Sequence, residues 1–264
     1  MKQHLIIANW KCNPPTFKEA VRLFEAAEEN AKNVKNVEIV ICAPNIYLSA
    51  MRPPLNPSLS KGGKKGGVIL GAQDCFWERQ GAYTGEVSAA MLKDVGCEYI
   101  IIGHSERRKY FGETDEIISK KLKAALSVGM KPIFCAGEEA TEKEQMKSVL
   151  EKQLAEGLKD VKPNKIANVV IAYEPVWAIS TSGGEYCTPD YAFSAGLVIR
   201  KFLINNYGKY GGNKIKIIYG GSVDGNSAAL YIKEAKMDGF LVGAASLKEE
   251  EFGKIIKNIS EISN

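Results

Sequence analysis

The sequence predicts an α/β fold in which eight parallel strands close into a (β/α)8 barrel that forms a single domain. Three observations predict it. The length of 264 residues is typical of such a barrel and requires no second domain. Short apolar runs alternate along the chain with longer amphipathic segments, which is the pattern of repeated βα units. The short runs are continuously apolar, as parallel strands buried on both faces should be.

Eight short runs are the expected strands, and the longer segments between them are the expected helices. The strands cover residues 4–9, 38–43, 68–72, 99–103, 131–135, 168–173, 215–219 and 239–242. The helices cover residues 16–32, 114–128, 142–158, 189–206, 226–235 and 247–259. Eight βα units in a chain of this length favour a closed barrel over an open sheet.

One segment, residues 52–67, interrupts this rhythm. It contains Pro53 and Pro54 and then a run of glycine and lysine, which predicts a flexible surface insertion. The run lacks the Gly-Lys-Ser/Thr ending of a nucleotide phosphate loop, and a strand follows it where a helix would be needed. Because it joins a helix to the next strand, we expect it at the barrel face opposite the carboxyl ends of the strands.

The composition excludes several classes of protein. With 45% hydrophobic and 25% charged residues, the chain matches an ordinary soluble globular protein. The net charge of +4 is mild and spread along the chain, so it does not indicate nucleic acid binding. No run approaches the roughly 20 apolar residues of a membrane span. The first residues lack the apolar core and cleavage site of a signal peptide.

The cysteines indicate a reducing compartment. All six are widely spaced, without a Cys-x-x-Cys motif or a Cys/His cluster. We therefore expect free thiols, a cytoplasmic protein, no metal site and no organic cofactor.

Polar and glycine-rich segments follow several of the expected strands. In a (β/α)8 barrel the functional side chains project from the carboxyl ends of the strands. The segments after the first, fourth, sixth, seventh and eighth strands are Asn9-Trp10-Lys11, His104-Ser105-Glu106, Glu174-Pro175-Val176-Trp177, Gly220-Gly221-Ser222 and Gly243-Ala244-Ala245.

In this order and at these strand ends, the five segments closely resemble the triosephosphate isomerase family, and the resemblance covers nearly the whole chain. Residues 81–86 also resemble the dimer-forming loop of that family, and residues 135–138 resemble the end of its fifth strand. The resemblance implies a TIM barrel and the interconversion of dihydroxyacetone phosphate and glyceraldehyde 3-phosphate, a step of glycolysis and gluconeogenesis. It also implies a homodimer with a small phosphorylated sugar as substrate.

The resemblance further implies roles for particular residues. Glu174 would be the base that removes a proton next to a carbonyl, which gives an enediolate. A neutral His104 and the ammonium group of Lys11 would stabilise the charge that develops on the substrate oxygens. Asn9 would orient Lys11 or donate to the substrate, and Glu106 would pair with Lys11 in the empty site. Ser105 would support His104.

Backbone amides would hold the phosphate group, because loops after the seventh and eighth strands of barrels form such sites. The resemblance implies that Ser180, Ser222, Gly243 and Ala244 contribute to this site. It identifies residues 175–184 as a lid that excludes water, and Thr84 as the residue that reaches the active site of a partner subunit.

Two departures from the family pattern keep alternatives open. Ser180-Thr181-Ser182 replaces the usual Gly-Thr-Gly and is followed by Gly183-Gly184, and Ala244 replaces a second glycine. One alternative is a barrel that binds phosphate but has lost catalysis. The other, which the phosphate loops alone would permit, is an isomerase that acts on a different sugar phosphate.

Overall fold

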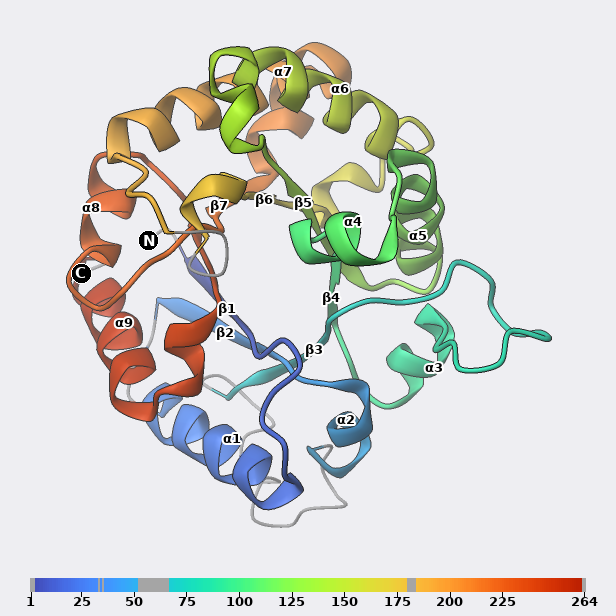
Figure 1. The fold of residues 1–264 in the computed structure, drawn as a ribbon, viewed down its shortest axis with the longest axis vertical. Coiled ribbons are helices and arrows are strands. Elements are labelled where there is room, and N and C mark those ends of the chain that lie inside the picture. The colour runs from blue at the N-terminus through green and yellow to red at the C-terminus, as the bar shows by residue number, and fades with distance from the viewer. Residues whose placement is uncertain (1–2, 33, 35, 52–66, 180–183, 263–264) are drawn as a thin grey trace.

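The protein is described by a computed structural model that covers residues 3–32, 34, 36–51, 67–179 and 184–262. Eight parallel strands form a closed barrel in chain order, and β8 pairs back to β1. The helices surround the barrel as a ring (Figure 1). The predicted fold class is therefore confirmed.

The strands are short, and the helices differ widely in length. The strands are β1 His4–Asn9, β2 Val37–Cys42, β3 Ile69–Ala72, β4 Tyr99–Ile102, β5 Lys131–Ala136, β6 Val170–Tyr173, β7 Lys216–Tyr219 and β8 Gly239–Val242. The α-helices are α1 Phe17–Ala31, α2 Asn45–Met51, α3 Ala89–Asp94, α4 Ser105–Phe111, α5 Asp115–Ser127, α6 Met146–Leu158, α7 Pro189–Lys214, α8 Ala228–Lys233 and α9 Glu249–Ile262. Short 3₁₀ helices include η2 Ala140–Gln145, η3 Ile166–Asn168, η4 Val176–Ala178 and η6 Ala244–Leu247.

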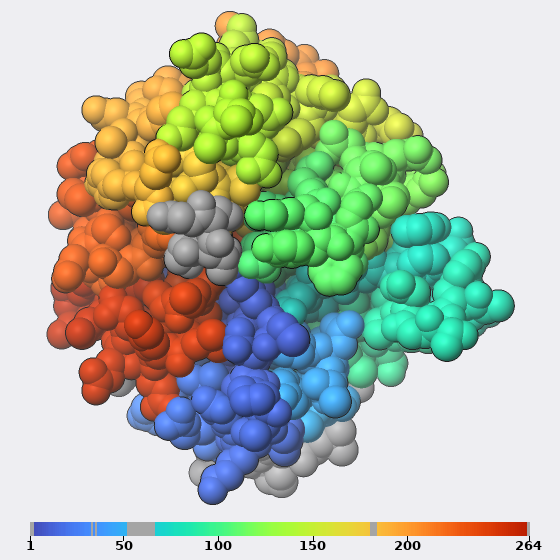
Figure 2. All heavy atoms as spheres, in the orientation of Figure 1, coloured from blue at the N-terminus to red at the C-terminus, as the bar shows by residue number. Residues whose placement is uncertain are grey.

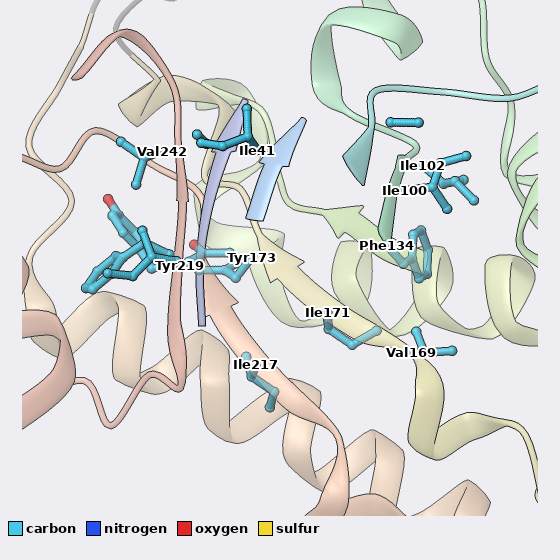
Figure 3. Packing of buried hydrophobic residues seen from close by; sticks show 14 of the residues in the cluster. Ile41, Ile100, Ile102, Phe134, Val169, Ile171, Tyr173, Ile217, Tyr219 and Val242 are labelled. Atoms are coloured by element: carbon cyan, nitrogen blue, oxygen red, sulfur yellow. The ribbon is translucent and has the colours of Figure 1, made fainter. Parts of the chain in front are cut away.

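The core has two layers, because successive side chains of a strand point to opposite faces. Leu5, Ile7, Tyr99 and Ile101 belong to a cluster that fills the barrel interior. Their neighbours along the strands, such as Ile6 and Ile100, belong to the larger cluster between the strands and the helices. Figure 3 shows part of this outer layer, with residues from several strands packed together. Both faces are buried, which explains the continuously apolar strands.

Threonine residues begin three of the longer helices. The side chains of Thr16, Thr114 and Thr188 accept hydrogen bonds from the backbone amides of Glu19, Ile117 and Tyr191, at the starts of α1, α5 and α7. Such a cap satisfies one of the amides that a helix leaves unpaired at its first turn. The sequence thus predicts the starts of these helices closely.

Several expected boundaries differ from the structure for local reasons. Residues 168–173 were expected to form one strand, but η3 covers Ile166–Asn168 and β6 begins at Val170. The helix expected from residue 142 begins as η2, and α6 follows at Met146. The helix expected at 189–206 continues to Lys214 as α7, with a break at Gly208, where φ is 74°. The short helices α2, α3 and α4 were not expected.

The loop between β3 and α3 projects from the body of the barrel. It is the turquoise segment at the edge of the molecule in Figures 1 and 2. The rings of Phe76 and Tyr83 pack against each other within it, with centroids 4.5 Å apart and planes tilted by 46°. This contact stiffens the loop that carries Thr84.

Some predictions concern residues outside the described ranges. They are the insertion at 52–67, except for Gly67, and Ser180 and Ser182 within the predicted lid. Within the described ranges, every helix is too short or too polar to cross a membrane.

Candidate active site

A pocket opens at the carboxyl ends of the strands and has an empty volume of about 540 Å³. The loops that follow β1, β4, β6, β7 and β8 line it, as the sequence predicts. The lining residues are Asn9, Lys11, His104, Glu174, Ile179, Gly220, Gly221, Ser222, Val223, Leu241, Gly243, Ala244 and Ala245.

Glu174 directly follows β6, and its side chain is only 2% exposed. Its Oε2 atom accepts a hydrogen bond of 3.1 Å from the backbone amide of Ser105. The thiol of Cys135 lies in the barrel interior beside this carboxylate, and burial, together with the charge of Glu174, raises the pKa of that thiol well above its usual value. Cys135 therefore stays a neutral thiol beside Glu174.

Two glycines provide the space that Glu174 occupies. A Cβ atom at Gly137 would lie 1.8 Å from the backbone oxygen of Glu174, and a Cβ atom at Gly220 would lie 2.7 Å from its Cγ atom. Real Cβ atoms do not approach other atoms so closely. Glycine at these positions lets the loop after β5 pack against the backbone of Glu174 and the loop after β7 pack against its side chain.

His104 lies between the carboxylate and the start of α4. Its Nδ1 atom accepts a hydrogen bond of 3.2 Å from the backbone amide of Glu106, so we assign the ring proton to Nε2. Nε2 lies 3.3 Å from Oε1 of Glu174. The imidazole therefore presents an N–H donor to the pocket next to the carboxylate.

Lys11 reaches the pocket from the loop after β1. Its Nζ atom lies 2.6 Å from Oε1 of Glu106, and the two side chains are 18% and 28% exposed. Its backbone has a φ of 54°, in the left-handed region that costs a non-glycine residue energy. The Oδ1 atom of Asn9 accepts a hydrogen bond from the Lys11 amide, and the Nε2 atom of Gln73 donates to the Lys11 carbonyl oxygen. These contacts hold the strained backbone.

The glycine-rich loops after β7 and β8 form the rest of the pocket wall, beside Glu174 and Lys11 respectively. A Cβ atom at Gly243 would lie 3.5 Å from Cε of Lys11, so this loop and the lysine are neighbours. Both the amide and the hydroxyl of Ser222 donate hydrogen bonds to the carbonyl oxygen of Ala178, at 3.0 and 2.8 Å. The loop after β7 is therefore joined to the chain just beyond Trp177.

The structure thus brings Asn9, Lys11, His104, Glu174, Ser222, Gly243 and Ala244 together around one pocket. Ser105 and Glu106 contact this group through the hydrogen bonds given above. Thr84 lies elsewhere, on the projecting loop, and is exposed. Ser180 falls outside the described residues.

Sequence reasoning missed Gln73, which directly follows β3 and supports Lys11. The rule that strand ends carry functional residues would have selected it. It also missed Ile179 and Leu241 as pocket walls. Neither has a sequence signal, because an apolar side chain at a strand end or in a loop looks like any core residue.

Comparisons with known proteins identify the family of the chain. The family model described as triosephosphate isomerase matches residues 4–259. A triosephosphate isomerase from Endomicrobium trichonymphae is 43% identical over 259 residues, which is 97% of this chain and 99% of that protein. One from Dictyoglomus thermophilum is 42% identical over 262 residues, 98% of this chain and 100% of that protein. One from Alkaliphilus oremlandii is 43% identical over 258 residues, 97% and 99% of the two chains.

The match spans nearly every βα unit, including the strand ends that line the pocket. An accidental likeness between two barrels would be expected to share the scaffold and differ in these loops, because barrels vary their chemistry through them. The chain belongs to the triosephosphate isomerase family.

Proposed function

We propose that the protein interconverts dihydroxyacetone phosphate and glyceraldehyde 3-phosphate, a step of glycolysis and gluconeogenesis, with Glu174 as the base. The observation that carries this proposal is the meeting of Glu174, His104 and Lys11 at one pocket in a member of the triosephosphate isomerase family. The reaction moves one proton between neighbouring carbons and requires a base, a donor to the oxygens and a cation.

The carboxylate of Glu174 takes a proton from the carbon next to the substrate carbonyl, which gives an enediolate. It then returns a proton to the neighbouring carbon. Its burial supports this role, because the pocket keeps bulk water away from the group that takes the proton. The hydrogen bond from the Ser105 amide keeps the side chain beside the pocket until the substrate arrives.

His104 and Lys11 stabilise the negative charge of the enediolate. The Nε2–H group of His104 donates to a substrate oxygen, and the same ring nitrogen passes protons between the two oxygens. Lys11 supplies a positive charge that attracts the phosphate and the enediolate. Glu106 holds the Lys11 ammonium in place while the pocket is empty, as their contact of 2.6 Å indicates.

The phosphate binds to backbone amides of the loops after β7 and β8, with Ser222, Gly243 and Ala244 as donors. In the present structure the Ser222 amide donates to Ala178. Phosphate binding at Ser222 therefore requires that this hydrogen bond breaks. Substrate binding is in this way coupled to Ala178, which belongs to residues 175–184, the segment predicted to be a lid.

Replacing Glu174 with glutamine tests the assignment of the base. Glutamine keeps the shape of the side chain but does not accept a proton at neutral pH. We expect Glu174→Gln to lower kcat by about 10² to 10⁴. A coupled assay with glyceraldehyde 3-phosphate measures the rate, and circular dichroism checks the fold.

Glu116→Gln is the matched control, because that carboxylate lies on α5 with a side chain that is 66% exposed. Its kcat should equal that of the wild type. A folded Glu174→Gln protein that turns over at a near-normal rate would contradict the assignment. A panel of pentose and hexose phosphates tests the alternative substrates, and phosphate binding without turnover would support a barrel that has lost catalysis.

We infer that the active form is a homodimer. A second pocket of about 860 Å³ lies beside Lys11 and is lined by residues that include Cys12, Asn45, Gln73 and Phe111. Large apolar side chains are exposed at Phe111, which lines this pocket, and at Ile46, which follows the lining residue Asn45, and Tyr83 is exposed on the projecting loop. Exposed apolar groups beside a pocket are typical of a protein interface. The loop that carries Thr84 in a second copy is the proposed occupant.

We also infer that the protein works in the cytoplasm. All six cysteines are free, and five of them are buried. Unpaired thiols persist in a reducing compartment. Localisation of a tagged chain by fluorescence microscopy tests this inference, and a signal confined to another compartment would contradict it.

A further inference from the structure

The connection between β5 and α6, residues 137–145, contacts the chain on both sides of residues 180–183. The Nζ atom of Lys143, in η2, lies 3.8 Å from the centre of the Trp177 ring. The same ammonium forms an ion pair with the carboxylate of Glu185. Trp177 precedes residues 180–183 and Glu185 follows them. One cation therefore binds both flanks of this segment.

The two flanks also contact each other. The backbone amide of Glu185 donates to the carbonyl oxygen of Trp177 at 3.3 Å. The Lys143 contacts and this hydrogen bond form a small cluster, Lys143, Trp177 and Glu185, which we call the flank cluster. An exposed ion pair alone contributes little, but here the ammonium also lies over an aromatic face.

Other contacts hold the members of the flank cluster in place. The indole Nε1 atom of Trp177 donates to Glu138 at 2.9 Å, and Glu138 is fully buried. The hydroxyl of Tyr191 donates to the backbone oxygen of Lys143 at 3.1 Å, and its ring packs edge-on against Trp177. Lys143 therefore extends from a fixed backbone toward a fixed ring.

We propose that Lys143 is a positioning residue for the isomerisation, and that it acts by holding Trp177 and Glu185 together through the flank cluster. The proposal rests on the proposed function. Trp177 follows the base Glu174 by three residues, and Ala178 accepts the hydrogen bonds from Ser222. The placement of Trp177 therefore affects both the base and the loop that binds phosphate. Without Lys143 both flanks gain conformational freedom, and fewer bound complexes have the productive geometry.

Steady-state kinetics test the proposal first. We expect Lys143→Met to lower kcat by about 3- to 10-fold while KM changes by less than about twofold, because the backbone groups that bind phosphate remain. Lys143→Arg should restore most of kcat, since arginine also pairs with carboxylates and stacks on aromatic rings. Glu185→Gln should lower kcat less than Lys143→Met does. The double variant should be no slower than Lys143→Met, since both changes break one cluster.

The fluorescence of Trp177 gives a readout that is independent of activity. All variants carry Trp77→Phe, so that Trp177 and the 1% exposed Trp10 are the remaining indoles. We expect acrylamide to quench the fluorescence of the Lys143→Met protein about twofold more strongly than that of its parent, because the face of the Trp177 ring is no longer covered by the Lys143 side chain. Lys120→Met is the matched control. Lys120 also pairs with a glutamate, on its own helix, and in the wild type it lies over the indole of Trp77. Because Trp77 is replaced in every variant, Lys120→Met should change neither kcat nor the quenching of Trp177.

Three results would overturn the proposal. The first is a Lys143→Met protein whose kcat and acrylamide quenching equal those of its parent. The second is a Lys120→Met protein with the same changes in kcat and quenching as Lys143→Met. The third is a double variant in which the losses of kcat from Lys143→Met and Glu185→Gln add. Failure of the proposed function is a separate result: the wild type would not turn over triose phosphates, yet quenching would still rise in Lys143→Met. The two failures are therefore distinguishable.

Discussion

At the scale of single residues, the burial of Asp74 disfavours the charged form of its carboxyl group. It follows Gln73 and lies beside the pocket next to Lys11. Both of its oxygens lie 2.8 Å from Nζ of Lys121, and one lies 3.0 Å from Nε of Arg107. Burial nevertheless outweighs these cations and raises the pKa of Asp74 to about 6. The folded protein therefore binds a proton here that the unfolded chain has already released.

This raised pKa predicts how stability depends on pH. Between the ordinary value of 3.8 and about 6, the folded state binds more protons than the unfolded state, so the free energy of unfolding falls as pH rises. The contribution of Asp74 amounts to up to about 3 kcal/mol. Asp74→Asn lacks it. The stability of the wild type relative to Asp74→Asn should therefore decrease between pH 4 and pH 7, as measured by urea unfolding. Parallel pH curves for the two proteins would contradict the shift.

At the scale of the element, two glycines inside helices have different neighbours, and these neighbours decide how a substitution by alanine changes stability. Gly196 lies in α7, where an added Cβ atom would meet Cε of Met237 at an ordinary contact distance of 3.5 Å. Gly157 lies in α6, where the same atom would lie 2.5 Å from Cζ of Phe134. The ring of Phe134 is fully buried and has no room to move.

Alanine substitutions should therefore change stability in opposite directions. Gly196→Ala should raise the free energy of unfolding by about 0.5–1 kcal/mol, because glycine in a helix costs conformational entropy. Gly157→Ala gains the same entropy but overpacks the core, so it should lower the free energy of unfolding by about 1–3 kcal/mol. Urea unfolding of both variants at one pH measures this. Equal signs for the two changes would show that the contact with Phe134 does not decide the outcome.

At the scale of the whole molecule, the projecting loop and the pocket beside Lys11 are the two features from which we infer a homodimer. The loop carries Thr84 at an exposed position, and the pocket shares Asn9, Lys11 and His104 with the candidate active site. A second copy that fills this pocket would bury the wall behind Lys11. Association would thereby influence catalysis as well as stability.

The proposed dimer predicts a mass of about twice the 28.9 kDa of the chain in light scattering at micromolar concentration. Thr84→Arg should shift the protein toward monomers and lower kcat by about tenfold or more, because a bulky charge would be forced into the pocket. Ser148→Arg, at an exposed position on α6, is the control and should do neither. A fully active wild-type monomer would contradict the dimer.

By itself, the sequence determined the barrel, its strand order and most of the residues at the pocket. Continuously apolar runs specify parallel strands buried on both faces, and the carboxyl ends of such strands meet at one face. Asn9, Lys11, His104 and Glu174 could therefore be grouped before any coordinates. The expected helix starts at residues 16 and 114 likewise lie within one residue of α1 and α5, where the structure shows threonine caps, because capping depends on neighbouring residues only.

Only the tertiary structure decided which distant groups touch. Gln73 supports Lys11 across 62 residues, Ser222 joins Ala178 across 44, and Lys143 joins Glu185 across 42. The space that Gly137 and Gly220 leave for Glu174 also arises between separate strands. Such contacts depend on how the βα units pack around the closed barrel, and this packing leaves no periodic or local pattern in the chain.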